Sequence, residues 1–148
     1  MHERVDARDG DLRDRGDRSL NTVKPKTAII LFAHGSRDPD WSAPFERIRR
    51  QVEIARPGAR VELAFLESTP PRLVQAAEKL IAQGVRSLII APLFMGQGAH
   101  AKRDLPELVE SLRSNYPSVT VRVLPALSDA PEVLDFIAAW IGNEAAQG

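Results

Sequence analysis

The chain has 148 residues, of which 43% are hydrophobic and 27% are charged, and its 20 basic and 20 acidic residues give a formal net charge of zero. This length and composition are typical of one globular domain with a normal core, and the balanced charge provides no general attraction to nucleic acid or to an anionic membrane. The absence of cysteine excludes disulfides, thiolate metal sites, cysteine-ligated iron–sulfur clusters and cysteine nucleophiles.

The first 26 residues differ in composition from the rest. They alternate aspartate with arginine, include two glycines and contain few large apolar side chains. Such a segment buries too little apolar surface to offset its ordering entropy, which predicts a disordered charged arm over residues 1–26 and one α/β domain over residues 27–148. We interpret the arm as a solvated extension, with an electrostatic docking arm as the alternative.

A membrane or secreted location is not expected. No apolar stretch approaches the roughly 18–20 residues of a membrane span, and the N-terminus is too charged for a signal peptide. The expected location is the cytoplasm.

Four apolar runs predict four β-strands. Residues 27–33 (TAIILFA) are apolar throughout, which is typical of a parallel strand buried on both faces. The other predicted strands cover residues 60–66, 87–92 and 119–124.

Each predicted strand is followed by apolar residues at helical spacing, which predicts four one-sided helices. The second opens at Pro70 or Pro71 and ends at Gly84. The apolar positions of the four helices are, in chain order, Trp41, Phe45, Ile48, Val52 and Ala55; Leu73, Val74, Ala77, Leu80 and Ile81; Leu105, Leu108, Val109 and Leu112; and Val133, Leu134, Ile137, Trp140 and Ile141.

Two of the helices carry a capping pattern at their expected starts. Asp104 with Glu107, and Asp129 with Glu132, place an acidic cap three residues before a glutamate. The third helix is therefore expected to begin at Asp104, and we interpret that aspartate as a cap rather than a ligand.

The alternation βαβαβαβα predicts an α/β fold with a four-stranded parallel sheet and helices on both faces. We expect the flavodoxin-like strand order 2-1-3-4, which brings the carboxyl ends of all strands to one rim. Four loops lie there: residues 34–40, 67–69, 93–103 and 126–129.

Two histidines lie on these loops. His34 directly follows the first strand and His100 lies in the loop after the third, whereas the remaining histidine, His2, lies in the arm. Imidazole accepts a proton or binds a divalent metal at cellular pH, so the pair can converge on one ligand or ion. Each histidine taken alone also fits an ordinary loop residue.

Further candidates surround this pair. Glu67 adds a carboxylate, or alternatively favours the dipole of the following helix. Glycines let a backbone approach a flat ligand closely, and the basic side chains can clamp carboxylates or be solvated surface charges. These residues are Gly35, Gly96 and Gly98, and Arg37, Lys102 and Arg103.

Several common motifs are absent. The sequence contains no GxxxxGK[ST], no GxSxG and no HExxH, which excludes P-loop chemistry, disfavours an α/β-hydrolase nucleophile elbow and leaves no zincin motif. The segment Gly96-Gln97-Gly98 lacks the third glycine of a dinucleotide fingerprint.

The rim motifs resemble those of a known family. AHGSR at 33–37, FLE at 65–67 with Pro71 soon after, and PLFMGQGAH at 92–100 leading into DLP at 104–106 are similar to the short sirohydrochlorin chelatases. These are the single-domain class II chelatases of sirohaem, cobalamin and related tetrapyrrole synthesis, and the resemblance covers residues 27–141.

The resemblance implies a metal-inserting lyase that places Co²⁺, Fe²⁺ or Ni²⁺ into sirohydrochlorin, with the metal as substrate and no permanently bound cofactor. It implies that His34 and His100 bind the metal and assist loss of the pyrrole protons, and that Glu67 faces the same cleft. Residues expected to bind the macrocycle are Ser36, Arg37, Gly96, Gly98, Lys102 and Arg103.

Larger class II chelatases hold the tetrapyrrole between two similar lobes, so a one-lobe chain is expected to form a homodimer. Two other functions stay open from the sequence: a non-catalytic tetrapyrrole or metal carrier, and a generic anion- or nucleotide-binding module. A carrier needs no proton acceptor, and an anion-binding module needs neither imidazole.

Overall fold

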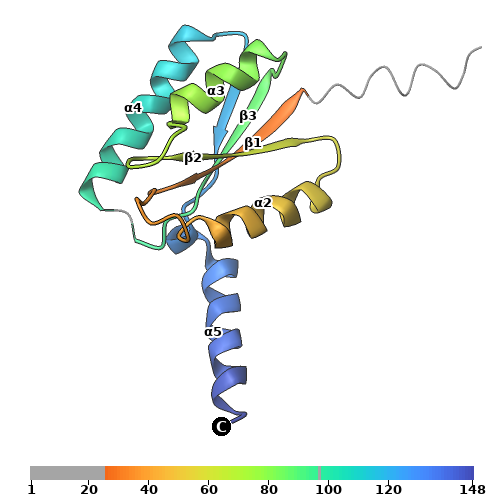
Figure 1. The fold of residues 1–148 in the computed structure, drawn as a ribbon, viewed down its shortest axis with the longest axis vertical. Coiled ribbons are helices and arrows are strands. Elements are labelled where there is room, and N and C mark those ends of the chain that lie inside the picture. Colours follow the sequence, from red (N-terminus) through yellow and green to blue (C-terminus); the bar gives the residue numbers. More distant parts are fainter. Residues whose placement is uncertain (1–25, 97) are drawn as a thin grey trace, which may run out of the picture.

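The computed structural model describes residues 26–96 and 98–148, with only the backbone of His100, so the predicted arm lies outside the described residues except for Lys26. Strands and helices alternate along the chain, as predicted (Figure 1). They are β1 (Thr27–Ala33), α2 (Ala43–Ala55), β2 (Arg60–Phe65), α3 (Leu73–Ala82), β3 (Ser87–Pro92), α4 (Ala99–Asn115), β4 (Thr120–Val123), the 3₁₀ helix η1 (Leu127–Asp129) and α5 (Pro131–Ala145).

The four strands form one parallel sheet in the order β2-β1-β3-β4, which confirms the predicted order. β1 lies between β2 and β3, with Ile29 beside Val61 on one side and Ile89 on the other. This central position explains why β1 is the most continuously apolar of the four runs. Because β1 and β3 are parallel neighbours, their carboxyl ends lie at the same rim. The order in which successive strands are added changes direction between these two strands, which is where open α/β sheets bind ligands.

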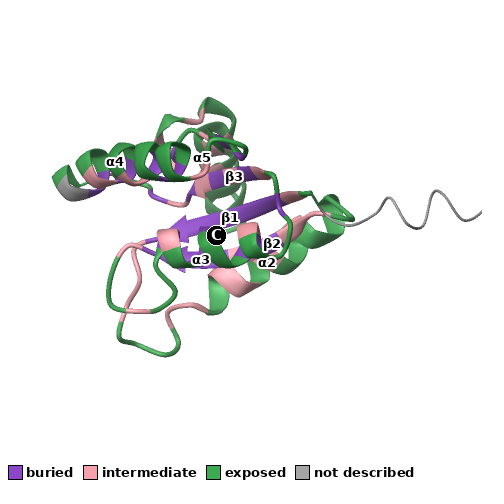
Figure 2. Ribbon diagram, turned by 90° about the horizontal axis from the view of Figure 1, so that it is seen from above, coloured by how far each residue is buried: buried purple, intermediate pink, exposed green. Residues whose placement is uncertain are grey.

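Two hydrophobic clusters lie on opposite faces of the sheet. The larger one fills the space between the sheet and helices α3 and α4 and includes Phe32, Leu88 and Leu112. The smaller one lies under α2, which packs mainly on β2. Buried residues accordingly concentrate in the strands, and all of α2 is exposed or half-buried (Figure 2). Within the predicted apolar side of α2, Ile48 and Ala55 are exposed.

Helix α4 begins earlier than predicted. It starts at Ala99 with Gly98 as the N-cap, so Asp104 lies inside the helix and the predicted capping box is wrong. The apolar stripe of Leu105, Val109 and Leu112 continues back to Ala101, which is 1% exposed in the core. Burial of that alanine extends the helix, although Pro106 lies in its interior.

Two other helix starts shift by a few residues. α3 begins at Leu73 rather than at Pro70 or Pro71, because the Pro71 carbonyl accepts the Phe65 N–H and keeps this segment extended beside β2. α5 begins at Pro131, and Asp129 belongs to η1 rather than capping the helix. The end of α3 is as predicted, since Gly84 follows with φ +99°.

Helix α5 does not cover the sheet. It extends away from the body of the domain (Figure 1). All its residues are exposed or half-buried. The five apolar side chains predicted for this segment therefore lie on a helix, as expected, but this helix does not pack against the sheet.

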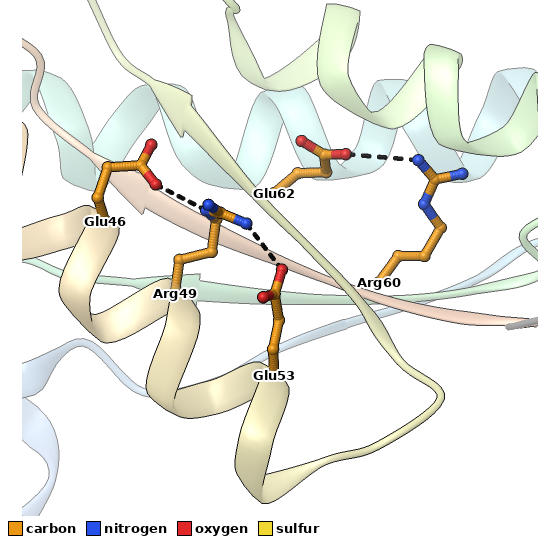
Figure 3. A network of polar contacts seen from close by, with 5 residues as sticks. All are labelled: Glu46, Arg49, Glu53, Arg60 and Glu62. Atoms are coloured by element: carbon orange, nitrogen blue, oxygen red, sulfur yellow. Dashed lines mark hydrogen bonds and ion pairs between the residues drawn. The ribbon is translucent and has the colours of Figure 1, made fainter.

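Ion pairs lie on the surface of α2 and of β2. On α2, Arg49 donates to Glu46 at 2.8 Å and to Glu53 at 2.7 Å, one turn away on each side (Figure 3). Within β2, Arg60 lies 3.7 Å from Glu62. The hydrogen bond with Glu46 raises the pKa of Arg49 above its ordinary value. Within residues 26–96 and 98–148, no helix is both long and apolar enough to cross a membrane.

Candidate active site at the carboxyl rim of the sheet

The loops after β1 and β2 are joined backbone to backbone. The Glu67 N–H donates to the His34 carbonyl at 3.0 Å, and the Thr69 hydroxyl donates to the Ser36 carbonyl at 2.6 Å. Gly35 has φ +91°, and a Cβ at this position would lie 1.9 Å from the Glu67 carbonyl oxygen. Only glycine allows this close approach, so the HGSR motif carries a structural requirement of its own.

Phe94 joins the other two loops to this pair. Its ring is 1% exposed, packs edge-on against Phe32 with centroids 5.5 Å apart, and lies 4.4 Å from the imidazole of His34. The Phe94 carbonyl accepts the Ser128 N–H at 3.3 Å, which anchors η1. The half-buried imidazole of His34 therefore lies against the buried ring of Phe94, tilted by 50° to it.

The first turn of α4 carries the second group of candidates. The backbone of His100 lies in this turn rather than in a loop, and its side chain lies outside the described part of the structure. Lys102 and Arg103 are exposed on the next positions of the helix. Because α4 starts at the rim, its N-terminal N–H groups and these two cations favour anionic groups there.

Gly96 and Gly98 differ from Gly35. A Cβ added at either residue would meet no described atom within 4 Å, and neither has a left-handed backbone. The domain itself therefore does not require glycine at these two positions. Open space next to the backbone agrees with their predicted role beside a flat ligand.

The remaining predicted residues lie at the outer edge of the rim. Glu67 and Arg37 are exposed, and the Ser36 hydroxyl accepts the Asp38 N–H at 3.1 Å. Ser36 and Arg37 line a cleft of about 340 Å³ together with Trp41. Trp41 was predicted on the apolar side of the first helix. It precedes α2 and is half-buried, with its ring centroid 4.5 Å from that of Phe45.

A second cleft, of about 450 Å³, lies between α3 and α4 at the ends of β1 and β2. Its polar lining comes from Arg72, Asp104 and Glu107, and its apolar lining includes Phe65 and Leu108, among others. The Arg72 guanidinium also donates to the Leu66 carbonyl. Arg72 was not among the residues predicted for the site, and Asp104 and Glu107 were predicted to form a helix cap.

Among the described side chains, which leave out His100, no three histidine, aspartate or glutamate residues gather into a metal-binding cluster. The described rim thus brings together one fixed imidazole, a nearby helix N-terminus with two cations, and two clefts. This arrangement can take a large anionic ligand and offer it a nitrogen base.

A parallel α/β domain with a histidine at the end of β1 and a glycine-containing loop leading into α4 defines a single-lobe chelatase-like protein. The family model for CbiX matches residues 28–143. The chain belongs to the CbiX family.

Curated relatives are sirohydrochlorin cobaltochelatases. That of Methanopyrus kandleri is 34% identical over 82 residues, covering 55% of this chain and 57% of the relative. That of Methanocaldococcus jannaschii is 32% identical over 89 residues, covering 60% of this chain and 62% of the relative. The matched segment thus spans less than two thirds of each relative.

The fold of this chain is also similar to the folds of solved structures. A CbiX protein of Marinobacter aquaeolei, linked by its name to cobalamin biosynthesis, has a TM-score of 0.69 and 28% identity, covering 82% of this chain and 99% of that one. The sirohydrochlorin chelatase SirB of Bacillus subtilis, solved with cobalt, has a TM-score of 0.60 and 27% identity. That alignment covers 68% of this chain and 43% of SirB, which is much longer than the matched lobe.

Proposed function

We propose that this protein is a cytoplasmic lyase that inserts a divalent metal ion, Co²⁺ in the first instance, into sirohydrochlorin. The observation that carries the proposal is the imidazole of His34, held against Phe94 where the rim loops meet, in a chain of the CbiX family. The names of the cobaltochelatase relatives support the choice of substrate and metal. Fe²⁺ and Ni²⁺ are alternative substrates, because imidazole and carboxylate bind all three ions.

The reaction replaces two pyrrole N–H protons by one divalent ion, so that free macrocycle and metal give metallated macrocycle and two protons. The chain has to supply a base for those protons and a place where the metal loses water. We assign both tasks to His34 and His100: both imidazoles bind the incoming ion, and they accept the pyrrole protons as the ion passes to the macrocycle. Glu67, exposed at the edge of the same rim, is assigned as a further acidic group facing the macrocycle.

The macrocycle carries many carboxylates, and the rim offers cations to bind them. We assign this role to Arg37, Lys102 and Arg103, with Ser36 lining the same cleft as Arg37. Gly96 and Gly98 give the ring close access to the backbone. One lobe covers only one side of a flat ligand. We therefore propose a homodimer that closes around the site.

Absorbance spectroscopy of sirohydrochlorin mixed with Co²⁺ and the protein tests this function. The wild type is expected to insert the metal faster than the spontaneous reaction. Replacement His34→Ala or His100→Ala is expected to slow insertion by at least about 100-fold, because each removes a proton acceptor or metal ligand. Circular dichroism should stay unchanged in both variants, and His2→Ala serves as the matched control.

Two outcomes would contradict the proposal. Insertion no faster than the spontaneous rate would reject catalysis, and binding of the macrocycle without acceleration would indicate a carrier. A wild-type rate in either rim variant would remove that histidine from the mechanism.

A further inference from the structure

The loop after β2 contains a strained turn at Ser68. Among the described residues, only Ser68 combines a side chain with a left-handed backbone, at φ +67°. The Thr69 N–H donates to the Glu67 carbonyl at 2.8 Å, and a bond of this span around a central residue with positive φ is the rare, strained form of the γ-turn. We call residues 67–69 the Glu67 turn. Because glycine would adopt this backbone without strain, a serine here requires contacts that hold it in place.

The Thr69 side chain supplies such a contact. Its hydroxyl donates at 2.6 Å to the carbonyl of Ser36, which lies 33 residues earlier in the chain, in the loop after β1. Thr69 is half-buried, whereas Glu67 and Ser68 are exposed. The hydroxyl therefore ties the end of the Glu67 turn to the backbone two residues after His34.

The beginning of the Glu67 turn is tied to the same loop. The Glu67 N–H donates to the His34 carbonyl at 3.0 Å, and the Glu67 carbonyl oxygen lies 1.9 Å from the position that a Cβ on Gly35 would take. Relaxation of Ser68 to a negative φ would move Glu67 relative to Thr69. The two ends of the turn could then not both keep their bonds to the loop after β1.

The direction of the Glu67 carboxylate depends on this backbone. The side chain is exposed, and none of the ion pairs among the described residues includes it. Since neither burial nor an ion pair holds the carboxylate, the backbone of the turn decides which part of the rim it can reach. Strained backbone persists only where surrounding contacts hold it, and such positions cluster at active sites.

We propose that Thr69 is a positioning residue for the reaction at this rim. Its hydroxyl holds Ser68 in the strained turn and thereby keeps the Glu67 carboxylate beside His34 before the macrocycle binds. This role rests on the proposed function, in which Glu67 faces the macrocycle. Thr69 acts through Glu67 and is assigned no contact with the metal or the macrocycle.

Insertion of Co²⁺ into sirohydrochlorin by three matched variants tests this role. Thr69→Val removes the hydroxyl, keeps the branched shape and is expected to lower kcat/KM at least about tenfold, because small displacements of a reacting group are costly. Thr69→Ser keeps the donor and should stay within about twofold of the wild type. The control is Thr120→Val, at an exposed position at the amino end of β4, and it should leave the rate unchanged.

Two double variants show whether Thr69 acts through Glu67. When Glu67→Gln is already present, Thr69→Val should lower kcat/KM by less than about a further twofold, since the group that it positions has lost its charge. When Thr69→Val is present, Ser68→Gly should restore kcat/KM by at least about threefold, since glycine adopts the positive φ without strain. A full additional loss in the first case, or no recovery in the second, would overturn the proposal.

Amide hydrogen exchange measures the hold on the Glu67 turn without the reaction. The Glu67 N–H, bonded to the His34 carbonyl, is expected to exchange at least about tenfold faster in Thr69→Val, and at the wild-type rate in Thr69→Ser and Thr120→Val. Unchanged protection in Thr69→Val would overturn the proposal even in an active enzyme. If the wild type failed to accelerate insertion but showed the expected exchange pattern, the proposed function would be rejected and the hold of Thr69 on the turn would be supported.

Discussion

At the scale of single residues, Gly35 determines how closely the first two rim loops approach each other. Its φ of +91° and the 1.9 Å distance from a would-be Cβ to the Glu67 carbonyl oxygen combine backbone strain with a steric clash. Because His34 directly precedes this glycine, the orientation of the proposed catalytic imidazole depends on the same turn.

Three glycine-to-alanine replacements separate these effects. Gly35→Ala is expected to lower the free energy of unfolding by about 2–4 kcal/mol, since strain and clash add. Gly84→Ala introduces backbone strain without a clash and should lower the free energy of unfolding by about 1–2 kcal/mol. Gly96→Ala introduces neither strain nor a clash, and its free energy of unfolding should stay within about 0.5 kcal/mol of the wild type. Urea unfolding measures all three, and equal losses at Gly35 and Gly84 would contradict the close approach of the two loops.

Some features of the site could be predicted from the sequence, and others could not. The position of His34 after an apolar strand was sufficient to place it at the rim, because the ends of parallel strands share an edge. The support from Phe94 could not be predicted, since the packing of two rings from loops 60 residues apart depends on tertiary structure. Arg72 was missed for the same reason: its cleft exists only where α3 meets α4.

At the scale of elements, α4 is the clearest difference between pattern and structure. The Asp104–Glu107 spacing and Pro106 are typical of a helix start, and this led to the wrong boundary. The true start depends on burial of Ala101, a small residue that hydrophobic periodicity does not distinguish from a loop alanine. The strands were predictable almost residue by residue, because continuous apolar runs are bounded by polar or turn residues.

Replacing Pro106 tests the position of the α4 start. In a helix that begins at Ala99, Pro106 lies in the interior and cannot donate to the preceding turn. Pro106→Ala should therefore raise the free energy of unfolding by about 1–3 kcal/mol. If the helix instead began at Asp104, the proline would lie in the first turn, and the same change should lower stability by about 0.4–1 kcal/mol. Thermal unfolding shows directly whether Pro106→Ala raises or lowers the stability.

Helix α5 shows a different limit of sequence reasoning. Its apolar periodicity correctly predicted a helix with a packing side, but periodicity does not state which surface covers that side. In the described chain the structure leaves Phe136 and Trp140 of this side exposed.

At the scale of the entire domain, the proposed function requires that two imidazoles from distant parts of the chain hold one ion. The sheet topology brings the ends of β1 and β3 side by side, so His34 and the first turn of α4 follow neighbouring strands. If both histidines bind one ion, titration with metal gives one site that depends on both residues. If they bind separately, it gives two weak, independent sites. This difference holds whether the two histidines belong to one copy of the chain or to two.

Calorimetric titration of the protein with Co²⁺ measures this most directly. One Co²⁺ ion per His34–His100 pair is expected. His34→Ala and His100→Ala should each lower the affinity for that ion by at least about tenfold, and His2→Ala should leave the affinity unchanged. If each single variant instead retained a Co²⁺ site of undiminished affinity, the two histidines would bind separately and the proposed site would be wrong.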